Sequence, residues 1–416
     1  MVDNCMDLGT CLVHGAVYEP LGVRFTTACV DGSPFERELH HVVDLDALGR
    51  TRARQQIPLR NVGMTHAHVA KRVDDALSCE NPVRGHQLFE PLLESRGDHR
   101  DTMDRFRLKT AFVTRGHTQA LKDGTVQPRT FDFDFEEVPV IINAFRRMVR
   151  GLEFDISEMA ITTYICARAY GKAFTALPIF LVRAFHHGAI VYNTKAGITG
   201  PTDLEGRKVG VNRGYTVTTG LWARSILQHQ YGVDLGRITW VLSGDEHVAE
   251  YQPPPNVVPI EKGRTLEDLL VSGEIAAAIG VQVDSPDVKP LIPNAKEAGF
   301  DALRERGLYP INHTLVVRDD VLSANPDLAS DIFDAFADAK RLYVQRLAAG
   351  EIEQSPEDAV YRRVMEITGG DPLPYGIEPN RRMLDAVIRH SLEQGIISRS
   401  VTVEELFPPN THGLIA

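Results

Sequence analysis

The chain has few of the residues that mark disulfide-bonded, zinc-binding or membrane-spanning proteins. It contains five cysteines in 416 residues, and no two of them form a Cys-x-x-Cys pair. This count and spacing match neither a disulfide framework nor a zinc signature and indicate a reducing compartment. The sequence has no apolar run long enough for a membrane span and no secretory signal at its start. We therefore expect a cytoplasmic protein without a membrane partner.

Positive charge is also in short supply. The chain has 45 lysines and arginines against 56 acids, which gives a formal net charge of −11. Nucleic acids and anionic membranes repel such a surface, so we do not expect them as partners. A small anionic ligand is compatible with this charge, because local arginines dominate within a screening length of about 8 Å. An assembly of identical chains is also compatible with the sequence.

Residues 1–102 show no sustained helical or strand periodicity. They contain seven histidines and four of the five cysteines, but the spacing of these residues matches no metal-ligand pattern. The short segment 22–30, GVRFTTACV, is a candidate strand. We predict a weakly ordered N-terminal extension without a metal site.

Strand and helix patterns alternate from Met103 onward. The first strands are expected at 105–113 and 131–138, and an amphipathic helix at 138–151. A repeated order of strand and helix predicts an α/β protein in which helices cover parallel or mixed sheets. We predict a first lobe from residues 103–194 and 309–416 and a second lobe from residues 195–308. Two crossings between such lobes allow a cleft to close on a ligand.

The segment 154–165 is expected to form a short strand, a turn at residues 155–158 and then a helix. Backbone N–H groups at a helix start, together with the helix dipole, bind anions. This places Glu158 at the turn, and Thr162 and Tyr164 in the first turn of the helix. The junction is therefore a candidate anion site.

An apolar strand follows and ends near Arg183, with His186 and His187 directly after it. Open α/β sheets bind ligands at this end of their strands. Histidine transfers protons near neutral pH, and arginine binds both oxygens of a carboxylate. Neighbouring residues on a strand face opposite ways, so at most one of the two histidines is expected to be catalytic. The alternative for Arg183 is a structural ion pair with Glu158.

The second lobe repeats this order of strand, loop and helix. Its strand at 206–212 leads to Arg213 and a hydroxyl-rich helix start, and further polar residues follow two later strand ends. The candidates there are Arg213, Tyr215, Thr216 and Thr218, then Glu246 and His247, and finally Asn312 and His313 where the chain re-enters the first lobe. The alternative to a functional role is helix capping for the residues from Arg213 to Thr218. For Glu246 and His247 it is a surface loop, and for His313 it is a hinge hydrogen bond.

Five segments resemble the 4,5-dihydroxyphthalate decarboxylase family. They are EMA-x-TTY at 158–164, LP-x-F at 177–180, FHHGAIVYN at 185–193, GRKVGV at 206–211 and YPINHT at 309–314. The resemblance extends from Met103 to about Glu405. It implies a type II periplasmic-binding-protein-like fold and the conversion of 4,5-dihydroxyphthalate to protocatechuate and CO2 in phthalate catabolism. Such a reaction needs no cofactor and no metal if a base, an acid and carboxylate-binding cations are in place.

We accordingly predict a carboxy-lyase that acts on an aromatic dicarboxylate. Catalytic roles are expected for His186, His187, His247 and Glu158, and substrate-binding roles for Arg183, Arg213, Thr162, Tyr164, Tyr215, Thr216, Thr218, Asn312 and His313. The same fold also occurs in solute receptors of ABC transporters, so a cytoplasmic binding protein for an aromatic acid is the alternative. A role like that of thiamine-pyrimidine synthases would need a pyridoxal phosphate lysine or a sacrificial histidine in a motif that the sequence lacks.

Overall fold

The computed structural model describes residues 17–18, 23–28, 40–44, 105–352 and 355–416. Three short strands precede residue 104: β1 (Val17–Tyr18), β2 (Val23–Ala28) and β3 (His40–Asp44), paired antiparallel in the order β1-β2-β3. The strand expected within 22–30 is confirmed by β2. The remaining expectations for residues 1–102, weak order and no metal site, lie outside the described residues.

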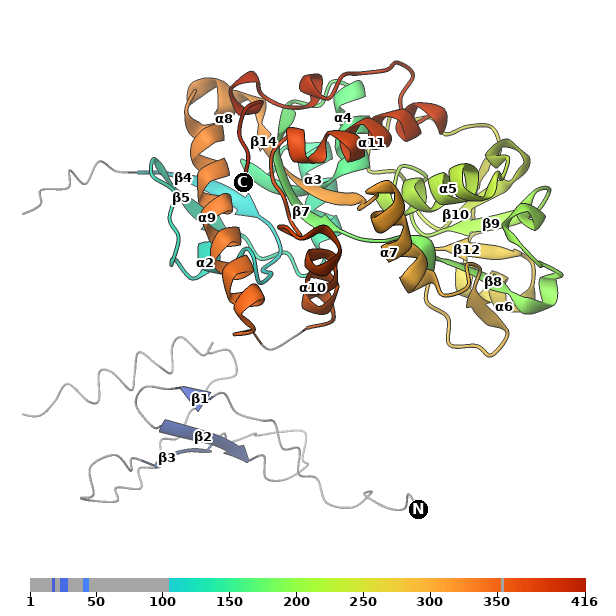
Figure 1. The fold of residues 1–416 in the computed structure, drawn as a ribbon, viewed down its shortest axis with the longest axis horizontal. Coiled ribbons are helices and arrows are strands. Elements are labelled where there is room, and N and C mark those ends of the chain that lie inside the picture. The colour runs from blue at the N-terminus through green and yellow to red at the C-terminus, as the bar shows by residue number, and fades with distance from the viewer. Residues whose placement is uncertain (1–16, 19–22, 29–39, 45–104, 353–354) are drawn as a thin grey trace, which may run out of the picture. The chain divides into compact units, whose positions relative to one another are not determined.

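The first large sheet has five strands in the order β5-β4-β6-β14-β7 (Figure 1). They are β4 (Phe106–Ala111), β5 (Phe131–Phe135), β6 (Ile156–Ala160), β7 (Phe174–Arg183) and β14 (Ile311–Arg318). β4 pairs parallel with β5 and β6, whereas β14 lies antiparallel between β6 and β7. Because β14 comes late in the chain, the polypeptide leaves this sheet after β7 and returns to its middle.

The second large sheet has six strands in the order β11-β10-β9-β12-β8-β13. They are β8 (Ile190–Asn193), β9 (Lys208–Val211), β10 (Thr239–Leu242), β11 (Val257–Pro259), β12 (Ala277–Ile279) and β13 (Val288–Pro290). β8 pairs antiparallel with β12 and β13, so it belongs to this sheet. The prediction that the first lobe extends to residue 194 was therefore wrong, because the chain crosses before Ile190.

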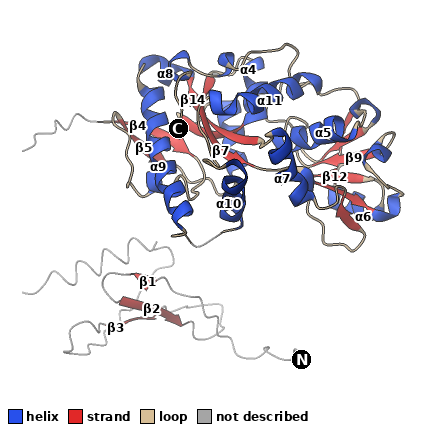
Figure 2. Ribbon diagram, in the orientation of Figure 1, coloured by secondary structure: helices blue, strands red, loops and turns tan. Residues whose placement is uncertain are grey.

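Helices cover both sheets (Figure 2). They are α2 (Gln119–Lys122), α3 (Ile141–Gly151), α4 (Ile161–Ala169), α5 (Thr218–Tyr231), α6 (Leu266–Ser272), α7 (Ala295–Arg306), α8 (Asp319–Ala324), α9 (Leu328–Ala349), α10 (Pro356–Thr368) and α11 (Arg381–Glu393). α9 packs its buried apolar face, including Ile332 and Phe336, against Leu177 and Leu315 of the first sheet. None of the described helices is long and apolar enough to cross a membrane.

One apolar core joins the two lobes. It contains Phe145 of α3, Ile165 of α4, Trp222 of α5 and Leu384 of α11. Trp222 also donates its indole N–H to the carbonyl of Ile311 in β14, at 3.0 Å. The two-lobed α/β architecture with two crossings is thus as the sequence predicted.

Two local expectations had different outcomes. The amphipathic helix at 138–151 is confirmed by α3, whose Ala144, Phe145 and Met148 are buried. The turn expected at residues 155–158 was wrong, because β6 runs from Ile156 to Ala160 with every residue buried and leads directly into α4. Burial on both faces favours continued strand pairing over a turn that would expose backbone groups.

Both large sheets and helices α2 to α11 lie after Met103. A chain that begins at Met103 keeps every strand of these sheets, so we expect it to fold and to retain the activity of the full chain. Circular dichroism during heating, together with an activity assay, measures this directly. Aggregation of the shortened chain, or loss of its cooperative melting, would show that residues 1–102 complete a core.

Candidate functional site

A fully buried carboxylate lies at the end of the first sheet. Glu158 in β6 has no exposed surface, and its two oxygens accept four hydrogen bonds. Arg115 donates through both terminal nitrogens at 2.8 and 2.9 Å, the amide of Val113 donates at 3.0 Å, and Nδ1 of His313 donates at 2.6 Å. A carboxylate with this many donors stays ionised although it is buried.

The loop after β4 is shaped to hold Arg115 in this position. The hydroxyl of Thr118 accepts from the amide of Arg115 at 2.8 Å and donates to the carbonyl of Val113 at 3.1 Å. Gly116 packs against the ring of Tyr343, where a Cβ atom would lie 2.2 Å from a ring carbon. Glycine is therefore required for this close approach, and the loop presents a guanidinium to Glu158.

His313 reaches Glu158 because of the register of two antiparallel strands. Glu158 pairs with Leu315 of β14, so His313 is its diagonal neighbour on the same face of the sheet. The hydrogen bond to Glu158 places the proton on Nδ1 and leaves Nε2 available to a ligand. The ring is partly exposed and packs edge-on against Phe145, with the ring centroids 5.0 Å apart.

Opposing effects act on the pKa of Glu158. Burial alone would raise it, but the hydrogen bond from His313 and the charge and hydrogen bonds of Arg115 outweigh burial. The pKa of this carboxyl is therefore held well below its usual range. Glu158 is an anion at neutral pH and serves as the fixed negative end of the pair with His313.

The second lobe contributes a histidine near the same phenylalanine. His247 follows β10, and its ring centroid lies 6.3 Å from that of Phe145. Neither of its ring nitrogens has a hydrogen-bond partner within the described part of the chain, although the residue is buried. Burial, with the nearby charges of Arg146 and Arg213, lowers the pKa of His247 to about 4. At neutral pH it is an uncharged imidazole that can accept or donate a hydrogen bond.

Arg213 lies at the carboxyl end of β9, in a conformation that side chains rarely adopt. Its φ of 70° falls in the left-handed region, and its amide donates to the hydroxyl of Ser243 at 2.7 Å. It lines a small cavity of about 50 Å³ with Asn212, Thr219 and Gly280. Within the described ranges no acid forms an ion pair with Arg213. Backbone strain of this kind often accompanies a functional position.

The anion site predicted at the start of α5 exists, but a side chain of the protein fills it. The carboxylate of Glu246 accepts hydrogen bonds from the amides of Tyr215 and Thr216 and, at 2.6 Å, from the hydroxyl of Thr216. A Cβ atom on Gly214 would lie 2.5 Å from a Glu246 oxygen, so glycine permits this approach. Tyr215 and Thr216 therefore bind an internal anion in this structure.

The helix starts of α4 and α5 contact each other. The hydroxyl of Thr162 donates to the carbonyl of Thr216 at 2.7 Å, and lies 2.7 Å from the hydroxyl of Thr218. All three threonines are buried. These hydroxyls join the two lobes beside the candidate site, in place of an open anion site at each helix start.

Two other predicted residues have hydrogen-bond partners other than Glu158. Arg183 is buried and donates to the carbonyl of Tyr309 at 2.8 Å and to the side chain of Asn380. The alternative of an Arg183 to Glu158 ion pair was therefore wrong, because Arg115 takes that position. Tyr164 donates to the carbonyl of Leu406.

The paired histidines point to separate partners. His186 donates from Nε2 to Asn312 at 2.8 Å, and His187 donates from Nε2 to Gln230 at 3.0 Å. Burial lowers the pKa of His186 to about 4 and also lowers the pKa of His187. Both follow the end of β7, as predicted, but the described structure does not bring them onto the buried carboxylate.

Two residues of this site were absent from the predicted set. Arg115 lies just after β4, at the sheet edge where the other strand ends had led to the histidines. Its position after a strand end could therefore have identified it from the sequence. Phe145 belongs to the apolar face of α3, so its pattern indicated only a core residue. Its contact with His313 depends on the return of β14 to the first sheet, and its approach to His247 depends on the way the lobes meet.

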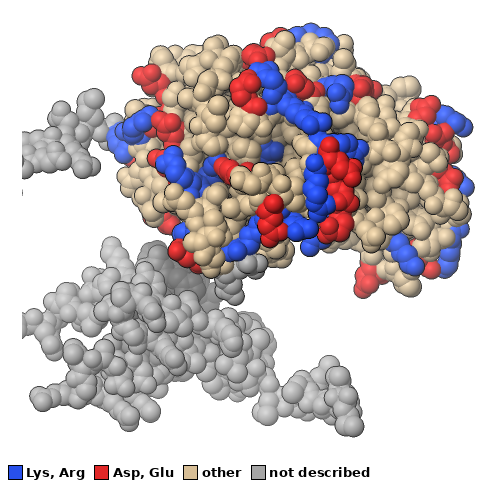
Figure 3. All heavy atoms as spheres, in the orientation of Figure 1, with Lys and Arg blue, Asp and Glu red and all other residues tan. Residues whose placement is uncertain are grey.

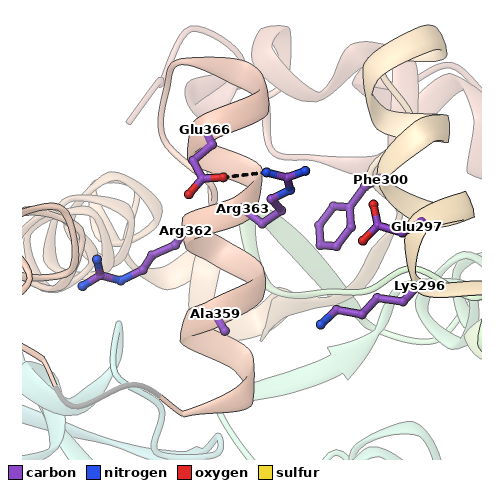
Figure 4. A pocket seen from close by; sticks show the side chains of 7 residues that line it. All are labelled: Lys296, Glu297, Phe300, Ala359, Arg362, Arg363 and Glu366. Atoms are coloured by element: carbon purple, nitrogen blue, oxygen red, sulfur yellow. Dashed lines mark hydrogen bonds and ion pairs between the residues drawn. The ribbon is translucent and has the colours of Figure 1, made fainter.

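A second hollow, of about 460 Å³, lies between α7 and α10 (Figure 4). Its lining includes both signs of charge, and Arg363 donates to Glu366 at 2.9 Å. Figure 3 shows acidic and basic side chains mixed over this part of the surface. None of the predicted site residues lines this hollow. Its lining carries three cations and two acids.

Comparison with known proteins gives two relatives with the same name. The chain is 30% identical over 326 residues to a 4,5-dihydroxyphthalate decarboxylase of Comamonas testosteroni, with 74% of this chain and 98% of the relative covered. It is 30% identical over 194 residues to a 4,5-dihydroxyphthalate decarboxylase of Pseudomonas putida, with 44% and 73% covered. No family model matches.

Among solved structures, the periplasmic aliphatic sulphonate binding protein SsuA from Escherichia coli is similar to this chain. The sequence identity is 12% and the TM-score is 0.42, with 73% of this chain and 92% of the other covered.

Glu158→Gln removes the charge but keeps the shape of the side chain. We expect a loss of about 3–5 kcal/mol at pH 7, because Arg115 then lies partly buried without its counter-charge. The pKa of Glu158 is lowered on folding, so its contribution is complete above the ordinary carboxyl pKa of about 4.3 and is lost as the pH falls toward the folded-state pKa. Urea unfolding at pH 7, 4 and 3 measures this shrinking difference.

Glu136→Gln is the matched control. Glu136 also contacts two cations, Arg147 and Lys109, but it is only half-buried. Such a pair typically contributes about 1 kcal/mol or less. Equal losses from the two variants at pH 7 would contradict the special position of Glu158.

Proposed function

The chain belongs to the 4,5-dihydroxyphthalate decarboxylase family, and we propose that it releases CO2 from 4,5-dihydroxyphthalate to give protocatechuate. The proposal rests above all on His313, which the buried carboxylate of Glu158 orients through Nδ1 while Nε2 stays available. This arrangement suits a proton donor to a ring carbon. The family relationship supports a decarboxylase, and the site supports the choice of a ring with hydroxyl and carboxylate groups.

The reaction needs one proton and a way to hold two carboxylates. A hydroxyl para to the leaving carboxylate transfers its proton to a ring nitrogen of His247 and so supplies electron density to the ring. His313, which carries a proton on both ring nitrogens at this step, transfers the one on Nε2 to the ring carbon that bears this carboxylate and keeps the one on Nδ1 toward Glu158. The bond to the carboxylate carbon then breaks, its electron pair restores the aromatic ring, and CO2 leaves. The phenolate recovers its proton from His247, and solvent returns a proton to Nε2 of His313.

The groups of the second lobe suit the rest of the substrate. Arg213 has no acidic partner within the described residues and can bind the remaining carboxylate with two parallel hydrogen bonds. His247 is uncharged at neutral pH and its ring nitrogens are unpaired in the described structure, so it can accept a hydrogen bond from a ring hydroxyl. Phe145 is buried next to both His313 and His247, so it helps to hold these two rings in position.

The direct experiment is to incubate the purified protein with 4,5-dihydroxyphthalate and to follow CO2 and protocatechuate. Formation of both in equal amounts supports the proposal. A solute receptor, the alternative function, would bind the compound without turnover. Tight binding of phthalate with no CO2 released from any dihydroxylated aromatic acid would therefore favour the receptor.

His313→Asn tests the proton donor. Asparagine can keep a hydrogen bond to Glu158 through its side-chain amide, but it has no counterpart of Nε2. We expect kcat to fall about 10²-fold to 10⁴-fold, the usual contribution of general acid catalysis, with much less change in phthalate affinity. Steady-state kinetics and a phthalate titration measure the two effects separately.

The matched control is His412→Asn, in a histidine whose ring contacts the carbonyl of Phe407 at the C-terminal end. It should leave kcat unchanged. His186→Asn and His187→Asn test the role that the sequence predicted for the adjacent histidines. A larger fall in kcat from either of these variants than from His313→Asn would transfer the proton-donating role to that residue.

Arg213→Lys tests the carboxylate contact. Lysine keeps the positive charge but lacks the planar pair of donors, so we expect KM and the phthalate Kd to rise about 10-fold. Arg207→Lys is the control, because Arg207 is an exposed arginine of the same lobe. Unchanged phthalate affinity in Arg213→Lys would remove Arg213 from the substrate site.

A further inference from the structure

Two histidines and one glutamate converge where α5 meets α11. His229 in the last turn of α5 donates from Nε2 to Oε2 of Glu393 at 2.8 Å. His390 of α11 donates from Nδ1 to the same oxygen at 3.1 Å. The two imidazole rings lie 4.6 Å apart, and the three ligand atoms all lie within 4.8 Å of one another. Among the described residues, these three side chains form a group whose ligand atoms lie close enough together to bind one metal ion.

The spacing is close to that of a tetrahedral metal site. Ligand bonds of about 2.0–2.1 Å place neighbouring ligand atoms about 3.3 Å apart. The two observed contacts to Glu393 are slightly shorter than this value, as expected when protons rather than a metal ion join the groups. Small side-chain rotations would bring all three ligand atoms to the required distance.

The donor set also has the right chemistry. Two imidazole nitrogens and one carboxylate oxygen suit Zn²⁺ and similar transition-metal ions, and they leave a position for water. His390 is held by its surroundings, because it is largely buried and its ring packs edge-on against Trp222 at 5.7 Å. His229 and Glu393 are partly exposed, so an ion can enter from solvent.

We propose that His229, His390 and Glu393 form a binding site for one divalent transition-metal ion that links the two lobes. α5 packs on the second sheet, whereas α11 packs against α4 of the first lobe. The two helices already share polar contacts, since Arg224 donates to Gln394 at 2.8 Å and Gln394 donates to the carbonyl of Leu221 at 3.1 Å. A bound ion adds a further link at this contact.

The site is separate from the proposed chemistry. Thr218 begins α5 near the candidate active site, and His229 lies eleven residues later, about 16 Å along the helix. The ion would therefore act on the stability of the contact between lobes and would not touch the substrate. Its binding does not depend on the decarboxylase proposal.

The test uses the full chain after treatment with a chelator, titrated with Ni²⁺ or Zn²⁺ by calorimetry at pH 7.5. Wild type should bind one ion more than His229→Gln, or should bind an ion at least about 10-fold more tightly, because even residues beyond the direct ligands affect affinity about 10-fold to 100-fold. The metal should also raise the melting temperature of wild type more than that of the variant. Histidines and cysteines elsewhere contribute equally to both proteins.

Two further variants make the result specific. Glu393→Gln keeps the hydrogen-bonding shape but removes the charge, and it should weaken the same binding event. His412→Gln removes a described histidine outside this group and should bind metal as wild type does. Identical metal binding and melting shifts in wild type, His229→Gln and Glu393→Gln would show that the cluster is held only by hydrogen bonds, and would overturn the proposal.

Discussion

The buried negative charge of Glu158 is the constraint on which the candidate site depends. An ionised carboxylate without exposed surface is costly unless positive charge and hydrogen-bond donors surround it. Arg115, Val113 and His313 meet this requirement from two segments that are remote from β6 in sequence. The loop after β4, the strand β6 and the returning strand β14 must therefore assemble together. His313 comes into place only because the chain re-enters the first sheet after completing the second.

The contacts between lobes beside this site are polar and replaceable by water. Arg146 and Arg150 of α3 form ion pairs with Asp245 of the second lobe, each at 2.8 Å, and Lys172 pairs with Glu250 at 2.7 Å. Exposed ion pairs of this kind contribute little to stability. Separating the two lobes at this edge therefore costs little free energy. The shared apolar core around Trp222 keeps the lobes associated. This combination suits a site that must admit a ring and then enclose it.

Sequence patterns predicted the α/β order, the two crossings and the strand ends where polar residues gather. Arg213 and His247 were selected because they follow strand ends, and His313 because the chain re-enters the first lobe there. Glu158 was selected for a turn, which the structure replaces with strand β6. Their roles in a site stay predictions. The hydrogen-bond partner of a side chain is not a local property of the sequence. His186 and His187 were selected because they are adjacent after a strand, yet they form hydrogen bonds with Asn312 and Gln230, which lie far away in the sequence.

Arg115 was missed because its contact with Glu158 depends on a loop that folds against Tyr343. The start of α5 predicted an anion, but could not reveal that Glu246 supplies it. β8 is apolar enough for either sheet, so only its pairing fixed the boundary.

The most direct measurement of the central claim is a crystal structure of the protein with phthalate bound. The account predicts the aromatic ring between the lobes beside Phe145, one carboxylate within hydrogen-bond distance of Arg213, and the ring carbon of the other carboxylate facing Nε2 of His313. Phthalate bound in the hollow between α7 and α10, or bound with His313 turned away from Glu158, would contradict it.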